Sequence, residues 1–209
     1  MIRFDFYTLF WTFFLGCFLG VVIETFWSFF QIHRFESRKG LVLGPFNLIY
    51  GFGALIITVS LSWLGKGYNW LIVVFGAVIG GIYEYVCSCI QIKLFQTVSW
   101  DYKDFKLNLH GKINFVYCVF WGILSLFCVR CLYPFVSQII WKIPELYIRL
   151  LTVGGLIFIV IDTVLSACVV HRKNSREKNT GQTNKFWEYI DRYYPDEKIE
   201  KIYPNMKKI

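Results

Sequence analysis

Three long apolar stretches of the sequence contain one acidic residue each, in the same setting. The stretches are Gly16–Ser28, Gly76–Ser88 and Gly154–Ser166, and their acids are Glu24, Glu84 and Asp162. A carboxylate inside an apolar run is costly, so it is expected to have a partner, a proton or a function. The three acids are therefore the first candidates for a site that binds a solute or an ion.

Helical spacing places the glycines, the acid and the serine of each stretch on one face. Residues four apart share a face of a helix, and Gly-x-x-x-Gly allows two helices in lipid to approach closely. The serines one turn beyond the acids are Ser28, Ser88 and Ser166. We expect the three faces to meet around a shared axis, with carboxylates that share a proton or a cation. The alternative is structural, because such an acid can also pair with a basic residue or cap a neighbouring backbone.

The composition identifies the class of protein that must position these residues. The chain of 209 residues is 56% hydrophobic and 17% charged, which is unlike an ordinary soluble domain. Runs of about 20 apolar residues are typical of membrane-spanning helices. The sequence predicts five of them, at 7–32, 45–64, 70–94, 113–133 and 148–170. The first is expected to be a retained span, because it contains Glu24 and lacks a basic leader and a cleavage site.

The predicted fold is an all-α polytopic membrane protein with a parallel two-helix internal repeat. The first two spans form one copy, the next two form the second, and the fifth is a half-copy without a return helix. Residues 1–171 are the expected transmembrane domain, and 172–209 are a basic cytoplasmic tail. A short amphipathic helix is predicted in the tail, on the membrane surface or, alternatively, on a partner protein. Its apolar residues are Phe186, Trp187, Ile190, Tyr193 and Tyr194.

The basic residues predict the orientation in the membrane. A cytoplasmic C-terminus, with the N-terminus outside, puts most of the 22 Lys and Arg residues on the inner side. An anionic inner leaflet then accounts for the net charge of +8 without a nucleic-acid partner. We therefore expect a multi-pass protein of the inner or plasma membrane.

The two predicted cytoplasmic loops contain the other candidate residues. Glycines and Pro45 before the second span suggest a backbone that enters the membrane, where protein must cover it. Asn47 and Tyr50 at the start of that span join the solute-binding candidates. Trp100 has an ordinary alternative role in the headgroup layer. The candidates of the loops are Arg38, Lys39, Trp100, Asp101, Asp104, Asn108, His110 and Lys112.

Two ordered motifs within about residues 10–135 carry a family resemblance. The first runs from Arg38-Lys39-Gly40-Leu41 to Ile49-Tyr50-Gly51-Phe52-Gly53-Ala54, and the second from Glu84-Tyr85 through Trp100-Asp101-Tyr102 to Lys112. Together they resemble the CmpB-like family of bacterial integral membrane proteins, described as type IV ABC-transporter permeases. The resemblance implies a bacterial inner-membrane protein with a transport function. The chain departs from the motifs at Asn47-Leu48, His110 and Lys112.

The leading functional prediction is a permease-like subunit that moves or binds a small solute or ion. Gly111-Lys112-Ile113 lacks the upstream glycine and the following hydroxyl residue of a phosphate-binding loop, so ATP hydrolysis would come from a separate subunit. The alternative is a membrane-embedded enzyme acting on a lipid or lipid-linked substrate at the cytoplasmic face, with an acid as general acid/base. No nucleophile motif favours an enzyme. No cofactor and no metal are expected, because Cys128-x-x-Cys131 has no second ligand pair. A homodimer is a further possibility, since five spans can barely enclose a path.

Overall fold

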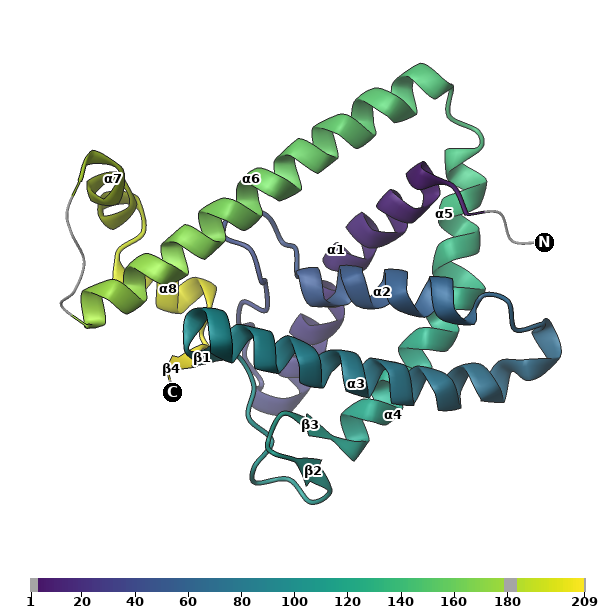
Figure 1. Ribbon diagram of the computed structural model, residues 1–209, viewed down its shortest axis with the longest axis horizontal. Helices are drawn as coiled ribbons and strands as arrows, with labels where there is room; N and C mark the ends of the chain where they lie inside the picture. The colour runs from purple at the N-terminus through teal and green to yellow at the C-terminus, as the bar shows by residue number, and fades with distance from the viewer. Residues whose placement is uncertain (1–3, 179–183, 209) are drawn as a thin grey trace.

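The structure is a computed structural model, and it describes residues 4–178 and 184–208. It is helical throughout, with four two-residue strands in the loops and the tail (Figure 1). The elements in chain order are α1 (Phe6–Ile32), α2 (Leu48–Leu61), η1 (Lys66–Tyr68), α3 (Asn69–Phe95), β1 (Thr97–Val98), β2 (Asn108–Leu109), β3 (Ile113–Asn114), α4 (Phe115–Phe127), η2 (Cys128–Leu132), α5 (Tyr133–Ile140), α6 (Glu145–Glu177), α7 (Lys185–Tyr193), α8 (Asp196–Ile202) and β4 (Lys207–Lys208).

Among the described residues, four helical segments are long and apolar enough to cross a membrane. They are Phe6–Ile32, Lys66–Phe95, Phe115–Ile140 and Glu145–Glu177. The predicted second span, 45–64, differs from this expectation because α2 has 14 residues. At 1.5 Å per residue such a helix is about 21 Å long, less than the roughly 30 Å of a hydrocarbon core. The fold is thus all-α and multi-pass, as predicted, but α2 is short.

An asparagine side chain caps the start of each return helix, α2 and α4. Asn47 accepts a hydrogen bond from the backbone N–H of Ile49 at the start of α2. Asn114 does the same for Val116 at the start of α4. An asparagine in this position satisfies one of the N–H groups that a helix start leaves without a partner. The two return helices therefore begin in the same way, although their sequences differ.

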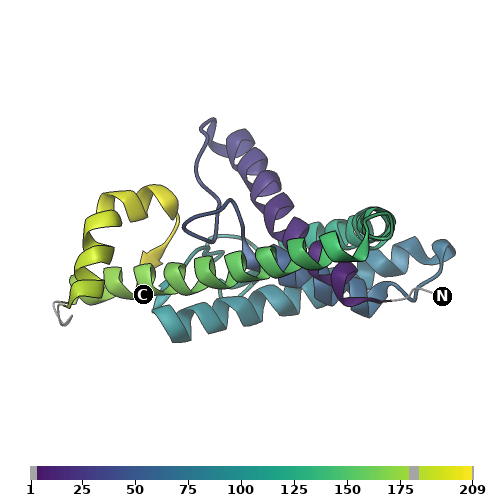
Figure 2. The same cartoon turned by 90° about the horizontal axis from the view of Figure 1, so that it is seen from above.

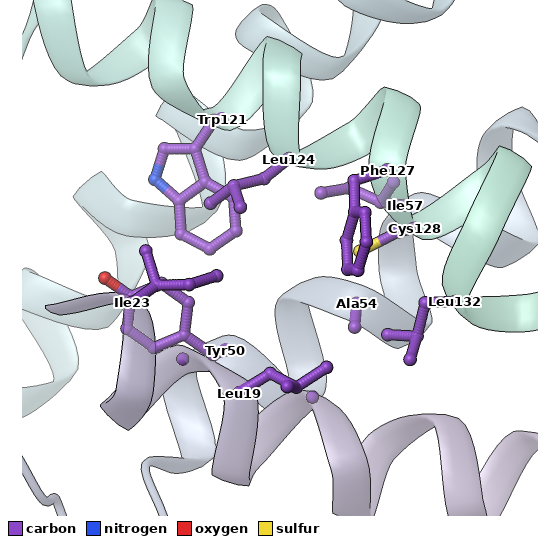
Figure 3. A pocket seen from close by; sticks show the side chains of 12 residues that line it. Leu19, Ile23, Tyr50, Ala54, Ile57, Trp121, Leu124, Phe127, Cys128 and Leu132 are labelled. Carbon is purple, nitrogen blue, oxygen red and sulfur yellow. The ribbon is translucent and has the colours of Figure 1, made fainter. Parts of the chain in front are cut away.

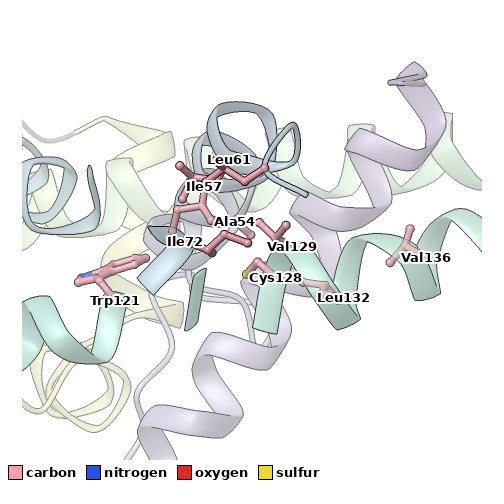
Figure 4. Packing of buried hydrophobic residues seen from close by; sticks show 10 residues of the cluster. Ala54, Ile57, Leu61, Ile72, Trp121, Cys128, Val129, Leu132 and Val136 are labelled. Atoms are coloured by element: carbon pink, nitrogen blue, oxygen red, sulfur yellow. The ribbon is translucent and has the colours of Figure 1, made fainter. Parts of the chain in front are cut away.

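The transmembrane helices pack as two hairpins. The helix α1 packs mainly on α2, and α3 packs mainly on α4, while α2 and α3 join the two pairs. The main apolar cluster lies where these helices meet η2 and α5 (Figure 4), and it consists of Ala54, Ile57, Leu61, Leu64, Ile72, Trp121, Cys128, Val129, Leu132 and Val136. The helix α6 makes lighter contacts with α1 and α3. The expected packing of the three acidic helices around one axis is therefore not found.

One arginine connects the π-helical turn η2 to the loop between α2 and α3. The Nε of Arg130 donates to the side chain of Asn69 at 2.8 Å. Its Nη2 donates to the carbonyl oxygens of Leu64 and Gly65 at 3.1 and 2.7 Å. Arg130 therefore satisfies two loop carbonyls and joins the two hairpins at the ends that lie away from Glu24 and Glu84.

The C-terminal helices fold back onto the end of α6 (Figures 1 and 2). The side chains of Ile190 in α7 and Ile199 in α8 are fully buried. They pack with Val169 of α6 and Val42 of the first loop. A helix is therefore present where the amphipathic one was predicted, and its buried residue Ile190 packs on other parts of this chain. Its exposed residues include Phe186, Tyr189 and Tyr193.

Candidate functional site

Glu24 of α1 is held by a tyrosine of the neighbouring helix α2. The hydroxyl of Tyr50 donates to the Glu24 carboxylate at 2.7 Å. The ring of Tyr50 lies directly against Gly20, one turn before the acid, where an added Cβ would be 2.1 Å from the ring. Only a glycine leaves room for an aromatic ring at that distance. The first Gly-x-x-x-Gly pattern thus accommodates an aromatic side chain as well as close helix packing.

Glu84 of α3 has the same arrangement with a different aromatic residue. The indole Nε1 of Trp121 in α4 donates to one carboxylate oxygen at 2.6 Å. The hydroxyl of Tyr102 in the second loop donates to the other oxygen at 2.9 Å. The Trp121 side chain lies against Gly80, where an added Cβ would be 2.4 Å away. Glu84 is 7% exposed, so the two donors largely replace water around its carboxylate.

Tyr102, in the loop between α3 and α4, is buried and stays a hydrogen-bond donor to Glu84. Burial raises the pKa of the Tyr102 phenol well above its ordinary value, and the charge of Glu84 adds to this increase. The neutral phenol is therefore the form present at physiological pH. Its hydrogen bond connects the second loop to the acid between the two helices of the hairpin.

The two aromatic residues also contact each other. The rings of Tyr50 and Trp121 are stacked, with centroids 5.8 Å apart and an interplanar angle of 20°. Figure 3 shows the oxygen of Tyr50 and the nitrogen of Trp121 on the same side of this stack. Glu24 also acts electrostatically on Glu84. The buried Glu84 and the half-buried Glu24 thus interact electrostatically, one on each hairpin, and the stacked rings lie between the hairpins.

An apolar cavity lies beside the stack, on the side away from the two polar atoms (Figure 3). Its volume is about 30 Å³, and the two rings and aliphatic side chains such as Leu19, Ile57 and Leu132 line it. A volume of this size holds about one water molecule. The stack therefore separates a small apolar cavity from the carboxylates.

Asp162 of α6 has a different set of partners from the other two acids. Its two carboxylate oxygens accept the backbone N–H groups of Leu43 and Gly44, each at 2.8 Å. Ser166 accepts the N–H of Val42 at 2.8 Å and donates to Asp162 at 3.3 Å. These contacts satisfy three successive backbone N–H groups of the loop between α1 and α2. Asp162 is therefore bound to the first loop, whereas Glu24 and Glu84 are bound to aromatic residues of the return helices.

The face of α6 that carries Gly154 and Asp162 also differs from the corresponding faces of α1 and α3. Nothing lies within 4 Å of a Cβ added at Gly154. A Cβ added at Gly155 would be 3.2 Å from the Phe10 ring, a tight contact, and 3.7 Å from the Phe14 ring. No aromatic ring lies against Gly154 as Tyr50 and Trp121 lie against Gly20 and Gly80. The helix α6 therefore shares the residue pattern of α1 and α3 but has a different packing partner.

The remaining residues near the first loop lie around Ser28. Arg38 donates to the Ser28 hydroxyl at 2.7 Å and lies 3.5 Å from Glu36. Arg38 also interacts electrostatically with Glu24, one turn before Ser28. Lys39 donates to the carbonyl of Val42 at 2.9 Å, within the loop itself. Arg38 is therefore near the acid pair, whereas Lys39 stabilises the loop. Ser88, the counterpart of Ser28, is buried in α3.

Most candidates of the second loop hold that loop in shape. Asn108 accepts the N–H of Gly111 at 2.9 Å and donates to loop carbonyls. Trp100 donates to the carbonyl of Lys112 at 3.0 Å, and Asp101 accepts the N–H of Lys103 at 3.1 Å. Asp104 is exposed. These side chains position Tyr102 and do not themselves reach the acid pair.

His110 and Lys112 lie on a separate face, beside α3. The Nδ1 of His110 is 3.1 Å from the Tyr85 hydroxyl. The Lys112 ammonium donates to the sulfur of Cys89 at 3.2 Å and lies 4.9 Å from the Tyr85 ring centroid. In the described part of the chain, no group of three or more His, Cys, Asp and Glu residues is placed to hold a metal ion.

Trp121 and Tyr102 are the site residues that the sequence reasoning missed. Tyr102 is part of the second motif, and Trp121 lies in an apolar run where an aromatic residue is usually a packing residue. A signal was nevertheless present, because Tyr50 and Trp121 each directly precede a glycine in a return helix, Gly51 and Gly122. Those glycines pack on Cys17 and Val73 of the acidic helices α1 and α3.

The long apolar helices, with Glu24 and Glu84 within them, define a multi-pass helical membrane protein with polar groups inside its transmembrane part. The chain belongs to the family described as "Putative ABC-transporter type IV", whose model matches residues 11–167. This confirms the resemblance seen in the two loop motifs and supports a transporter-like membrane protein. No curated protein and no solved structure matches the sequence.

Proposed function

We propose that this protein is a permease-like subunit that moves or binds a small solute or ion at the Glu24–Glu84 pair. The observation that carries the proposal is the meeting of two membrane-embedded carboxylates on separate hairpins. Membrane proteins rarely keep such groups unless they bind a substrate, an ion or a proton. The family membership supports transport as the general function.

The proposed path runs along the boundary between the α1–α2 and α3–α4 hairpins. The stacked rings of Tyr50 and Trp121 close this boundary, with the carboxylates on one side and the apolar cavity on the other. A solute that carries a positive charge or a proton would reduce the repulsion between the acids. Separation of the two rings would then connect the carboxylates with the opposite side. This is a rigid-body motion of two hairpins, as is common in transporters built from repeats.

The membrane arrangement that we propose has five crossings, with the N-terminus outside and the C-terminus in the cytoplasm. The short helix α2 begins inside the membrane, because the preceding loop is bound to Asp162 in α6. Asp162 lies roughly 12 Å along α6 from Val170, the expected inner end of that span. The loop and α2 together then cover the membrane thickness.

Contacts among the loops support this two-sided arrangement. The hydroxyl of Tyr203 donates to the Gly40 carbonyl at 3.3 Å, and β4 pairs with β1. The first loop, the second loop and the C-terminal segment therefore lie on one side. Arg130 joins the loop between α2 and α3 to the opposite ends of the helices. The division into residues 1–171 and 172–209 follows from the same proposal.

A parallel internal repeat is part of the proposal. Gly20, Tyr50 and Glu24 in the first hairpin correspond to Gly80, Trp121 and Glu84 in the second. In both triads the glycine accommodates the ring and the ring donates to the acid. The return helix of the second hairpin is one turn longer between its asparagine cap and the aromatic residue. Matching contacts made by different aromatic residues favour a duplicated unit over a coincidence of composition.

The cytoplasmic loops are the proposed contact region for a separate ATPase subunit. Purification of the tagged chain from its native membrane, followed by identification of bound ATP-hydrolysing proteins, tests this point. The purified complex is then reconstituted in vesicles and screened for uptake of small solutes with and without ATP. We expect uptake that Glu84→Gln abolishes and that Glu145→Gln, at an exposed residue outside both cytoplasmic loops, leaves unchanged. Equal uptake by the Glu84→Gln variant would exclude the acid pair as the transport site.

A further inference from the structure

The C-terminal strap, residues Lys185–Lys208, is bound to α6 by a compact group of ion pairs. Asp191 of α7 accepts from Arg172 at 2.9 and 2.6 Å and from Arg176 at 2.5 Å. Arg176 also donates to Asp196 at the start of α8, at 2.5 Å. A carboxylate shared by two guanidinium groups is held more firmly than a single exposed pair. The ion pairs thus fix the strap to the last turns of α6.

An apolar contact extends the strap from α6 to the first loop. Ile190 and Ile199 are fully buried, and they form one cluster with Val169 of α6 and Val42 of the loop. Val42 is 5% exposed, and the strap residues cover it. Because Val42 directly precedes Leu43 and Gly44, the strap packs on the segment whose N–H groups Asp162 and Ser166 hold.

The strap also reaches both cytoplasmic loops through its last residues. Tyr203 donates to the carbonyl of Gly40 in the first loop. The strand β4 pairs with β1, with Val98 opposite Lys207 in the register. Figure 1 shows β4 beside β1 at the end of α3, next to the end of α6. One segment therefore connects α6, the loop before α2 and the loop after α3.

We propose that the strap is an intramolecular latch that holds the loop of residues 40–47, and through it the position of Tyr50 against Glu24. Asp162 and Ser166 hold the N–H groups of this loop, and the strap packs on its Val42 side chain and donates to its Gly40 carbonyl. The loop leads directly into α2, whose first residues include Tyr50. A partner that displaced the strap would loosen the loop and so alter the acid pair without touching it. This inference concerns the loop, so it stands whether or not the acid pair carries a solute.

Hydrogen–deuterium exchange of the full-length protein in lipid nanodiscs tests the latch. Asp191→Asn combined with Ile190→Asp removes the shared carboxylate and introduces a charge into the buried cluster. Glu188→Gln on the same helix is the matched control, because Glu188 is exposed and lies outside both contacts. The amides of Val42, Leu43 and Gly44 report on the loop.

We expect the double variant to expose the amides of the strap and to raise exchange at the three loop amides by about tenfold or more, as in a local opening. The turn formed by Asn108 and Gly111 should exchange as in the wild type, which excludes general unfolding. The Glu188→Gln variant should match the wild type throughout.

Two results would overturn the proposal. If the strap amides exchange freely while the loop amides keep their protection, Asp162 and Ser166 hold the loop without the strap. If the strap amides remain protected in the double variant, the strap is not held by the contacts described. Either result leaves the proposed transport function intact, because that function is tested by uptake and not by exchange.

Discussion

Tyr50 and Trp121 stack on each other while each donates its polar hydrogen to a different membrane-embedded glutamate. The ring centroids are 5.8 Å apart, and the hydrogen bonds to Glu24 and Glu84 are 2.7 and 2.6 Å long. Each ring lies against a glycine one turn before its acid. Packing and polarity are thus coupled, because a movement of either ring changes the helix contact and the solvation of a carboxylate together.

Substitution of the glycines beneath the rings should disrupt this arrangement. Gly80→Ala places a Cβ 2.4 Å from the Trp121 side chain, and Gly20→Ala places one 2.1 Å from Tyr50. The rings must then shift, and overpacking of this kind costs about 1–3 kcal/mol. Thermal unfolding in detergent should show a lower Tm for both variants.

Gly154→Ala is the control for these substitutions, because nothing lies within 4 Å of its added Cβ. It should leave the Tm unchanged or raise it slightly, since alanine favours helix by about 1 kcal/mol over glycine. An equal loss of stability in all three variants would show that helix effects, and not the rings, decide the outcome.

Removal of the Trp121 hydrogen-bond donor should destabilise the protein mainly through the lost hydrogen bond to Glu84. Trp121→Phe keeps an aromatic ring but leaves one oxygen of Glu84 without its hydrogen bond. An unsatisfied buried group of this kind costs about 1–3 kcal/mol. The double variant with Glu84→Gln should recover part of the loss, because a neutral amide is cheaper to leave unpaired. Trp141→Phe, at a residue that is 67% exposed, should have little effect on the same unfolding measurement.

Helix periodicity explains how much of the acid pair could be predicted from the sequence. Glu24 and Glu84 share a face with two glycines each, and that face does meet another helix. The identity of the opposing residue was not predictable, because an aromatic residue in an apolar run can face lipid, core or a polar group. Trp121 was missed for this reason. The same uncertainty affects Asp162, whose pattern matches the others although its partner is a loop backbone.

The short helix and the docked tail show two other limits of sequence reasoning. Hydropathy predicted a span at 45–64, but Asn47 begins the helix at Leu48 because the preceding backbone is bound to Asp162 and Ser166. Amphipathic spacing predicted the helix α7 correctly. It did not reveal what covers Ile190, because a membrane, a partner protein and the end of α6 all accept an apolar face.

Neutralisation of Asp162 should loosen the loop before α2, because its carboxylate accepts two of the backbone N–H groups of that loop. In Asp162→Asn the amide group turns its NH2 toward one of the two N–H groups that the carboxylate accepts, so one hydrogen bond is lost. We expect faster exchange at Leu43 or Gly44 and easier proteolysis of the loop in the detergent-solubilised protein. Asp104→Asn, at an exposed position, is the control. Unchanged exchange would mean that backbone contacts within the loop are sufficient to hold it.

Docking of the strap should depend on pH in a defined direction. The hydrogen bond from Arg172 is the largest influence on Asp191, and it lowers the pKa of this carboxyl below its ordinary value of 3.8. A group with a lowered pKa in the folded state contributes stability that is fully present above the ordinary value and is lost as the pH falls through the lowered one. Exchange of the strap amides, corrected for the intrinsic pH dependence, should therefore stay constant from pH 7 to about pH 5. Below the ordinary value it should rise in the wild type more steeply than in Asp191→Asn, which lacks this contribution at every pH. An equal acid response of the two proteins would show that other carboxylates control the docking of the strap.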